Sequence, residues 1–394
     1  MSMNILVNLN ISNDSNFEAD SGYIFQKLIW EQICSMREDI NVFLLGHKSM
    51  GEEWGRHMKI IPIFEKFDKY STRFHFDWLN LREIVRNLPK IDLVINNQPE
   101  HSLALKLLLA SEYNKIVPLV SYYHYLPFHY INGKIVFDES QNLLGFPAKF
   151  IMKKNLEAMA VSDLNLIGSD FGIEICRKAC QEFYPGEKLG PFKKLPPPVE
   201  QTLFKQKQHT VKSLPKILYN QRLYKHYGTD KLVDILCDLA QEVRFELIVS
   251  DPTAKRSSER NRLDPHVAKI REKLNGLPFA KIQHGETRED YHSIINNIDI
   301  AIAPLKPSAL WSMAVADVLA AGKPVLCPNV GAFPEIVEQT PGLLFDSESE
   351  LISKLKQLIE KSKYSEEQLK SNVKGVHETQ IAKAMMKIVL GIKL

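Results

Sequence analysis

The order of its segments constrains this chain more than any single motif does. Short β-rich runs alternate with stretches of helical periodicity, stop once, and then start again. The interruption, residues 193–216 (KKLPPPVEQTLFKQKQHTVKSLPK), holds three consecutive prolines that exclude a helix, followed by a polar, basic run typical of an interdomain connection. Alternating strands and helices build parallel sheets. The sequence therefore predicts an α/β protein made of two doubly wound, Rossmann-like domains that face a cleft.

The strands expected in the two arrays share a short apolar core with polar residues after it. Before the interruption we expect NILVNLN (4–10), NVFLLG (41–46), IDLVINN (91–97), IVPLVSYYH (116–124) and DLNLIGS (163–169). After it we expect KILYNQRL (216–223), FELIVS (245–250), AKIQHGE (280–286), DIAIAPL (299–305) and KPVLCP (323–328). The predicted domains are residues 1–205 and 206–375, and a final helix over 376–394 is expected to return to the first domain.

Length, charge and cysteine content limit the class of protein. The 394 residues exceed one ordinary core, and a net charge of +3 gives no global reason to bind nucleic acid or an anionic surface. The N-terminus lacks the pattern of a secretory signal, and no apolar run approaches the ~18 residues that span a bilayer. The five cysteines are odd in number and scattered, which predicts reduced thiols and a cytoplasmic protein. Cys176 and Cys180 share a helix face, but no second pair completes a zinc site.

Polar residues follow the predicted strands of the second array, where ligands of open α/β sheets bind. Asn220, Arg222 and Lys225 come between a strand and a helix, and a phosphate there would meet two cations and helix amides together. The alternative is a solvated basic turn. His284 and Gly285 follow another strand, ahead of a helix that Thr287 is expected to cap.

The stretch PSALWSMAVADVLAAGKPVLCP (307–328) predicts a loop, an alanine-rich helix, a Gly-Lys-Pro stop and a buried strand. Its small residues allow the helix to pack closely on the sheet, and Asp317 is its lone carboxylate. We place the start of the helix near Ala309, so that its amides point at a ligand.

Two residues of the first array are candidates. Gly22 is expected in a polar loop ahead of a helix, and His124 lies among aromatic residues at a strand end. A structural role is the more common one for a lone histidine.

Taken in order, these pieces resemble the donor domain of GT-B glycosyltransferases, most closely the large retaining family of glycogen-synthase-like and mannosyltransferase enzymes. The resemblance spans residues 215–350 and extends more weakly into the first domain. The pieces that carry it are Arg222 with Gly228, His284-Gly285, Pro307-Ser308, Ala320 to Val325, Gly331 to Val337, and Gly342 to Phe345.

The resemblance implies a nucleotide-diphosphate sugar as donor, a UDP-sugar by expectation, with no other cofactor. The family's arginine matches Arg222, whereas its lysine position falls on Tyr227, so Lys225 or a residue elsewhere would have to replace that lysine. Of the family's two glutamates, the first falls on Ala309 and the second on Asp317. The family's glycine-rich loop reads Leu310, Trp311, Ser312, next to Ser308.

The expected activity is that of a retaining hexosyl- or pentosyltransferase. Arg222, Lys225 and the amides of the opening helix would stabilise the departing diphosphate, and His124 would contact the sugar or the acceptor. The chain has no Asp-x-Asp pair, which predicts a metal-independent reaction.

The acceptor is the most open question. Residues 64–78 interleave aromatic and basic side chains, as a nucleic-acid acceptor would require, and the basic loop 254–262 could extend that surface. A modified nucleobase of DNA, as in phage DNA glycosylation, is therefore one expected acceptor. Residues 141–159 suit either weak peripheral membrane contact, with a polysaccharide or glycolipid acceptor, or a core helix. A small-molecule acceptor and a degenerate, non-catalytic binding protein are the remaining alternatives.

Overall fold

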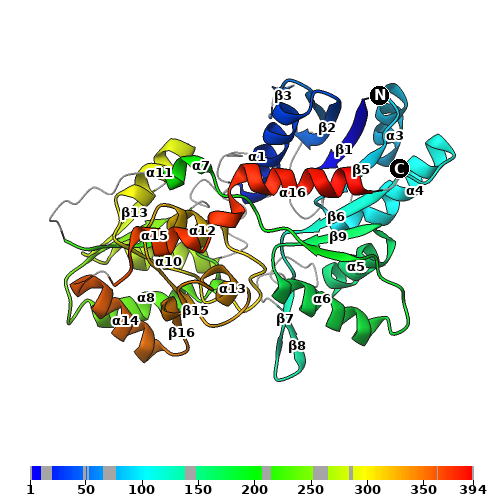
Figure 1. The fold of residues 1–394 in the computed structure, drawn as a ribbon. Coiled ribbons are helices and arrows are strands. Elements are labelled where there is room, and N and C mark those ends of the chain that lie inside the picture. Colours follow the sequence, from blue (N-terminus) through cyan, green and yellow to red (C-terminus); the bar gives the residue numbers. More distant parts are fainter. Residues whose placement is uncertain are drawn as a thin grey trace. The chain divides into compact units, whose positions relative to one another are not determined.

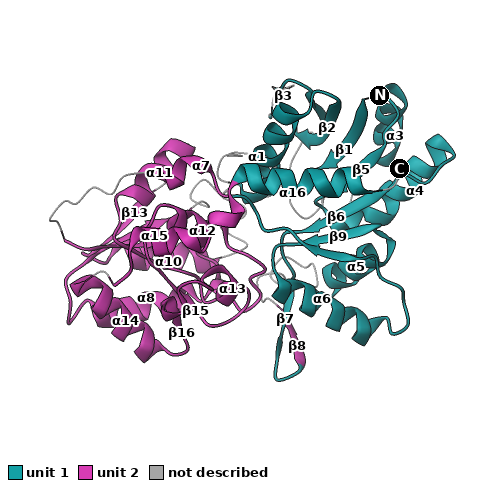
Figure 2. Ribbon diagram, in the orientation of Figure 1, with its two compact units in different colours: residues 1–133, 146–198, 378–394 teal, residues 134–145, 199–377 magenta. Residues whose placement is uncertain are grey.

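The computed structural model divides into two compact units, shown in Figure 2. Unit 1 holds residues 1–133, 146–198 and 378–394, and unit 2 holds residues 134–145 and 199–377. The long segment of unit 2 begins directly after the prolines at 196–198, seven residues before the expected boundary. The structure describes residues 2–9, 20–47, 50, 53–64, 77–137, 148–205, 214–251, 265–283, 287–361 and 363–392.

Unit 1 contains a parallel sheet with one antiparallel edge strand. Its strand order is β10-β9-β6-β5-β1-β2-β4-β3, and only β3 pairs antiparallel. The strands are β1 (Met3–Asn8), β2 (Ile40–His47), β3 (Glu53–Gly55), β4 (Met58–Phe64), β5 (Leu93–Asn96), β6 (Leu119–Tyr123), β9 (Leu164–Ile167) and β10 (Phe192–Lys194). A separate hairpin consists of β7 (Phe128–Ile131) and β8 (Lys134–Phe137).

The helices of unit 1 connect these strands, as Figure 1 shows. They are α1 (Ser21–Met36), α3 (Trp78–Asn87), α4 (Ser102–Tyr113), α5 (Ala148–Val161), α6 (Asp170–Phe183) and α16 (Glu378–Gly391). The C-terminal helix α16 packs against α1. Ser169 caps α6 by accepting a hydrogen bond from the amide of Gly172, at 3.1 Å.

Unit 2 contains a six-stranded parallel sheet in the order β13-β12-β11-β14-β15-β16. Its strands are β11 (Lys216–Tyr219), β12 (Glu246–Ser250), β13 (Ala280–Gln283), β14 (Ile300–Ile302), β15 (Val325–Pro328) and β16 (Leu344–Phe345). Its helices are α7 (Gln201–Phe204), α8 (Thr229–Leu239), α10 (Pro265–Asn275), α11 (Arg288–Asn296), α12 (Met313–Ala320), α13 (Phe333–Ile336), α14 (Glu348–Glu360) and α15 (Glu366–Ser371). Two α/β units with parallel sheets confirm the predicted fold class.

The small residues of α12 serve close packing, as the sequence predicts. Ala316 and Ala320 have no exposed surface, and both belong to the same core as the strands β11, β14 and β15. A side chain larger than alanine at either position would enter a packed interior, where added volume is costly. The sheet therefore holds α12 tightly and fixes where its N-terminal end lies.

The segment expected to suit either membrane contact or a core is a core helix wherever the structure describes it. Ile151 and Met152 on α5 are fully buried, whereas Phe150 is 44% exposed. Residues 141–147 lie outside the described part. No helix of the described residues is both long and apolar enough to cross a membrane.

Candidate functional site

In each sheet there is one place where the chain reverses its direction of winding, and ligands of open α/β sheets bind at such switch points. In unit 2 the chain runs outward from β11 through β12 and β13, then returns to place β14 on the other side of β11. The carboxyl ends of β11 and β14 therefore form the switch point. In unit 1 the corresponding place lies between β1 and β5.

Asn220 joins the end of β11 to the start of α12. Its side-chain amide donates hydrogen bonds to the hydroxyl of Tyr291, at 3.1 Å, and to the carbonyl of Ala314, at 3.4 Å. The residue is 8% exposed, so these bonds satisfy a largely buried group. They place the segment after β11 beside the first turn of α12.

A basic segment follows Asn220. Arg222 is half-buried and Lys225 is exposed in a short 3₁₀ turn, residues 225–227. The carbonyl of Tyr227 accepts a hydrogen bond from the amide of Leu305, at 2.9 Å, which ties this turn to the segment after β14. Gly228, at φ +66°, permits the approach, because a Cβ there would lie 2.8 Å from the Cβ of Leu305.

The contact between Leu305 and Tyr227 places Lys306 beside the turn, a cation that the family resemblance did not predict there. The ammonium of Lys306 lies 5.0 Å from the centre of the Tyr227 ring, a cation–π geometry. Tyr227 occupies the position where the resembled family has its lysine, so the structure supplies a lysine there from a different segment. The only sequence signal for Lys306 is its place directly after a strand end, in APLKPS.

The loop between β14 and α12 is held from two sides. Ser308, Ala309 and Leu310 are buried, and the carbonyl of Ala309 accepts a hydrogen bond from the amide of Ala332, at 2.9 Å. A Cβ at Gly331, whose φ is +61°, would lie 3.0 Å from that same carbonyl oxygen. Backbone contacts from the segment after β15 therefore set the conformation of this loop.

The start of α12 differs from our expectation. The helix begins at Met313 rather than near Ala309, because Ser312 has an extended backbone and caps it, accepting a hydrogen bond from the amide of Val315 at 3.3 Å. The expected start of the helix near Ala309 is therefore wrong, whereas the role of the helix amides stays a prediction. Trp311 is half-buried, and its indole Nε1 is buried with no hydrogen-bond partner among the described residues.

Asp317 belongs to a buried polar cluster. It is 2% exposed, and its Oδ2 accepts a hydrogen bond from the Tyr291 hydroxyl, at 3.0 Å. Burial raises the pKa of Asp317 to about 6, against the opposing charge of Arg288, whose guanidinium lies 3.9 Å from Oδ2. Its other oxygen, Oδ1, has no partner within the described structure.

Arg288 connects this cluster to the entry of unit 2. Its Nε donates a hydrogen bond to Oε1 of Glu200, at 2.7 Å, and the second oxygen of Glu200 lies 3.3 Å from Nε2 of His292. The Thr287 side chain caps α11, which carries Arg288 and His292, in a complete capping box, as the sequence predicts. Sequence patterns did not single out Arg288 or Tyr291 as candidates.

The two candidates of unit 1 lie near its switch point, Gly22 on the helix after β1 and His124 after β6, the strand beside β5. Gly22 is the second residue of α1, not part of a preceding loop, and its amide donates a hydrogen bond to Oδ1 of Asp20, at 2.9 Å. Our placement of Gly22 is therefore wrong, because Asp20 starts the helix earlier than the periodicity suggests. His124 follows β6 and packs against Phe25 and Tyr122.

Burial lowers the pKa of His124 to about 4, and the charge of Asp20 opposes this only in part. His124 is therefore uncharged at neutral pH, and it can act there as a hydrogen-bonding group but not as a cation.

The structure gathers the remaining candidates in unit 2. Asn220, Arg222, Lys225, Ser308, Ala309, Leu310, Trp311, Ser312 and Asp317 all lie on segments that follow β11 and β14. His284 and Gly285 lie outside the described residues, as do most of residues 64–78 and the whole of 254–262. The part of the chain that the structure describes holds no group of three or more His, Cys, Asp or Glu that could bind a metal ion.

Most of unit 2 matches a known protein family. Residues 215–361 match the family model described as Glycosyl transferases group 1. A search of curated protein sequences gave no match.

Among solved structures, sucrose-phosphate synthase from Thermosynechococcus elongatus superposes with a TM-score of 0.73 at 14% identity, covering 99% of both chains. HepE from Anabaena, in complex with UDP and glucose, gives 0.69 at 14% identity, covering 99% of this chain and 100% of its own. The lipopolysaccharide outer core galactosyltransferase WaaB gives 0.60 at 13% identity, covering 99% of both chains. At these identities the structural likeness speaks for the fold alone, and it confirms the GT-B resemblance seen in the motifs.

Proposed function

We propose that this chain, which has a GT-B fold and matches the Glycosyl transferases group 1 model over residues 215–361, is a glycosyltransferase. In this proposal it transfers a hexosyl or pentosyl group from a UDP-sugar to an acceptor hydroxyl with retention of configuration. The observation that carries the proposal is the set of cations at the switch point of unit 2.

Transfer of the sugar leaves a diphosphate whose negative charge grows as the glycosidic bond breaks. Groups already in place around that charge lower the barrier, because they need no reorganisation during the reaction. Arg222 and Lys225 follow β11, and Lys306 approaches from the segment after β14. These three cations fit a bound diphosphate, in which Arg222 supplies a forked donor and the two lysines supply point charges.

UDP is the nucleotide that we propose, and the solved complexes of HepE with UDP and with UDP-glucose support this choice. Trp311 is the single tryptophan of residues 134–377, so its fluorescence can report binding in unit 2. We expect UDP to change the intrinsic fluorescence of the protein and Trp311→Phe to remove the change. The other nucleoside diphosphates are the controls, and an equal response to all of them would contradict the choice of uridine.

The reaction itself is tested with a panel of nucleotide sugars, by following the slow release of free nucleotide without an acceptor. Release from one donor, lost in Arg222→Ala, is the expected result. We propose that no metal is required, so EDTA should leave the rate unchanged. Retention is then checked by NMR of the first product, whose anomeric configuration must equal that of the donor.

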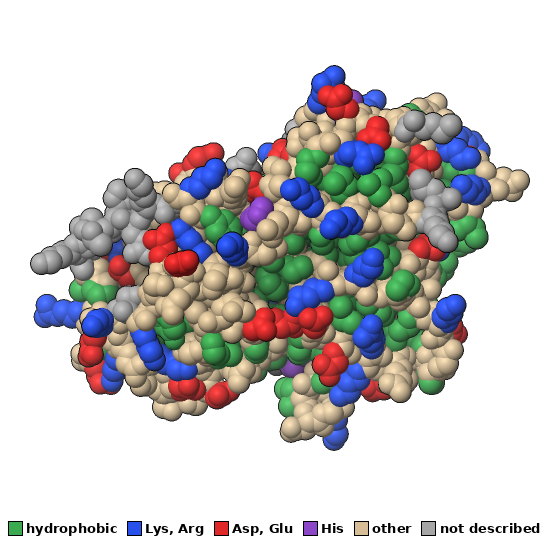
Figure 3. Space-filling view, in the orientation of Figure 1, with side chains coloured by type: hydrophobic (Ala, Val, Ile, Leu, Met, Phe, Trp, Pro, Cys, Tyr) green, Lys and Arg blue, Asp and Glu red, His purple; other side chains and the backbone are tan. Residues whose placement is uncertain are grey.

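A modified nucleobase in DNA is the acceptor that we propose, on the strength of the aromatic and basic sequence of residues 64–78. Basic side chains on the face shown in Figure 3 are interspersed with acidic and apolar ones, so that face offers no continuous basic surface. Transfer to DNA containing hydroxymethylated bases, with affinity falling steeply as salt rises, would support this acceptor. Transfer to a glycolipid or a small sugar, and none to such DNA, would contradict it.

A further inference from the structure

The switch point of unit 1 contains a chain of hydrogen bonds whose direction is fixed at both ends. The chain runs through Trp30, Gln26 and Asn97 to His124, and it ends at the backbone carbonyl of Asn8. Gln26, Trp30 and Asn97 have no exposed surface, so water cannot stand in for any partner. Each amide must therefore take the orientation that satisfies all of its neighbours.

The first fixed end is Trp30. An indole nitrogen can only donate, and it donates to Oε1 of Gln26, at 2.8 Å. The other end of the Gln26 amide must then be its NH₂ group, which donates to Oδ1 of Asn97, at 2.6 Å.

The second fixed end is the Asn8 carbonyl, which can only accept. It accepts from Nδ2 of Asn97, at 3.0 Å, and from the Asn97 backbone amide, also at 3.0 Å. Asn97 therefore receives the same orientation from both sides. Its oxygen faces Gln26, and its NH₂ group faces Asn8.

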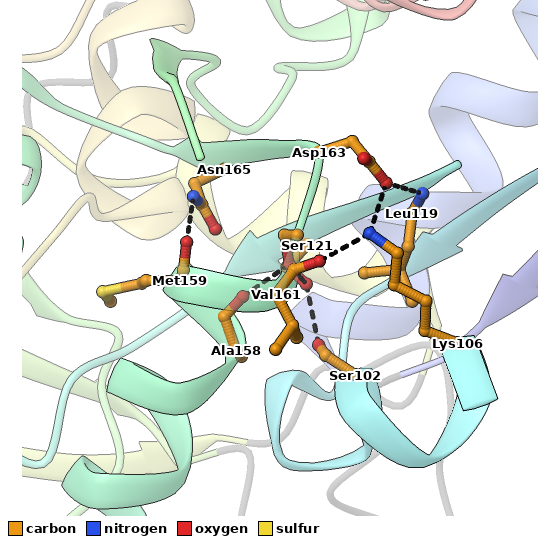
Figure 4. A network of polar contacts seen from close by, with 10 residues as sticks. Ser102, Lys106, Leu119, Ser121, Ala158, Met159, Val161, Asp163 and Asn165 are labelled. Carbon is orange, nitrogen blue, oxygen red and sulfur yellow. Dashed lines mark hydrogen bonds and ion pairs between the residues drawn. The ribbon is translucent and has the colours of Figure 1, made fainter. Parts of the chain in front are cut away.

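The side chain of Asn8 is fixed by a second buried series of hydrogen bonds, which runs through Asn96 and three serine hydroxyl groups. The Asn8 amide donates to Oδ1 of Asn96, at 2.8 Å, and Asn96 donates to Ser102, at 2.8 Å. Figure 4 shows the continuation, in which Ser102 meets Ser121 and the series ends on the carbonyl of Ala158. Since Ser162 gives its proton to that carbonyl, at 2.7 Å, each preceding hydroxyl must donate in the same direction.

The orientation of Asn97 determines which ring nitrogen of His124 carries the proton. Its Nε2 lies 3.3 Å from Oδ1 of Asn97, an atom that can only accept, so Nε2 must carry the proton. In a neutral ring the other nitrogen, Nδ1, then has a free lone pair. Within the described structure Nδ1 makes no hydrogen bond.

We propose that the chain of Trp30, Gln26 and Asn97 is a positioning device that fixes His124 as the Nε2–H tautomer, so that Nδ1 is presented as a hydrogen-bond acceptor to a hydroxyl group of the substrate. The part of this that concerns the substrate rests on the proposed function, whereas the tautomer is a property of the free protein. Asn97 is the central residue, because it is the member of this chain that forms a hydrogen bond with the imidazole. A hydroxyl is the matching ligand group, because it can donate to an uncharged acceptor.

The test is ¹⁵N NMR of the free, full-length protein labelled at its histidines, with His124 assigned from the signals lost in His124→Gln. We expect a protonated Nε2 and an unprotonated Nδ1, both at their limiting shifts and constant from about pH 5.5 to 8, since burial keeps the pKa of His124 near 4. Asp20 is the charged group that acts on this ring, and its charge opposes the effect of burial only in part. A protonated Nδ1, or shifts averaged between the tautomers, would overturn the proposal.

Two variants separate positioning from a merely structural role. Asn97→Leu removes the acceptor while keeping a side chain that branches at Cγ, and it should move the His124 shifts toward those of an unrestrained imidazole. Trp30→Phe should leave them at the limit, because Asn8 still orients Asn97. Unchanged signals of His292 in unit 2 show that each variant is folded there, and far-UV circular dichroism checks the rest of the chain. Limiting shifts retained in Asn97→Leu would overturn the proposal.

Kinetics with the donor identified above provide the second readout. Loss of one positioned hydrogen bond should lower kcat/KM of Asn97→Leu about tenfold, and Asn97→Asp, which keeps the acceptor oxygen, should recover part of it. The NMR result does not depend on any sugar nucleotide, so a failure of the proposed donor role of Arg222 would leave it standing.

Discussion

Two charged residues of unit 2, Asp317 and Lys306, differ in their surroundings, and this difference decides which role each side chain is suited to. Asp317 is buried among residues of α11 and α12, and this burial disfavours its ionised form even though the guanidinium of Arg288 opposes the effect. Lys306, which follows β14, has its ammonium over the ring of Tyr227. Asp317 is therefore suited to stabilising the buried cluster with Tyr291 and Arg288. Lys306 is suited to binding an anion.

Asp317 should make stability depend on pH in the weakly acidic range. Its folded-state pKa of about 6 lies above the unfolded value, so protonation favours the folded state. The stabilisation is complete below about pH 4 and is lost as the pH rises through 6, by up to about 3 kcal/mol. Urea unfolding from pH 4 to 8 measures it, and Asp317→Asn should remove this part of the slope. Parallel curves for the two proteins would show that Asp317 is not the group responsible.

Lys306 should matter for turnover rather than for folding. Lys306→Met keeps the apolar stem over Tyr227 but removes the ammonium, so we expect kcat to fall by about 100-fold with the melting temperature nearly unchanged. Lys363→Met, at an exposed lysine of the same unit, is the matched control. Equal rates for both variants would exclude Lys306 from the diphosphate site.

At the scale of elements, local chemistry sets helix starts, whereas contacts between distant segments set the site. Thr287 could be predicted as a cap because the signal lies within four residues. The start of α12 was predicted too early, because Ala309 and Leu310 favour a helix by composition. The structure instead holds them as a loop through Ala332 and Gly331, contacts that no local pattern contains.

The serine relay of unit 1 joins α4, β6 and the end of α5 through buried hydroxyls. Ser121→Ala should cost about 1–3 kcal/mol, because it leaves Ser102 and Ser162 without their common partner in a dry interior. Equilibrium urea unfolding measures the loss. Ser353→Ala, on the exposed face of α14, should stay within about 0.5 kcal/mol. A similar small effect at Ser121 would mean that water replaces the lost hydroxyl.

At the scale of the whole molecule, the alternation of strands and helices was enough to predict two α/β domains, since it depends only on periodicity. The pairing of Lys306 with Tyr227, and of His124 with Asn97, could not be predicted in the same way. Each joins segments that become neighbours only through the order of strands in a sheet, β11 beside β14 and β5 beside β6. The residues that complete each candidate site can therefore be identified only once the order of strands in the sheet is known.

The order of strands in unit 2 predicts that UDP binds where β11 and β14 end. UDP alone should slow amide hydrogen exchange in residues 214–228 and 303–320, the segments that follow β11 and β14, and leave β5 and β6 of unit 1 unchanged. At a concentration of 100 times its Kd, a ligand stabilises the state that binds it by about 2.7 kcal/mol, so amides that exchange only through opening of this site should slow about 100-fold. Arg222→Ala should abolish this protection, because without the guanidinium the diphosphate loses its forked donor. Protection by UDP confined to unit 1 would place the nucleotide in the other sheet and overturn the assignment of the donor site.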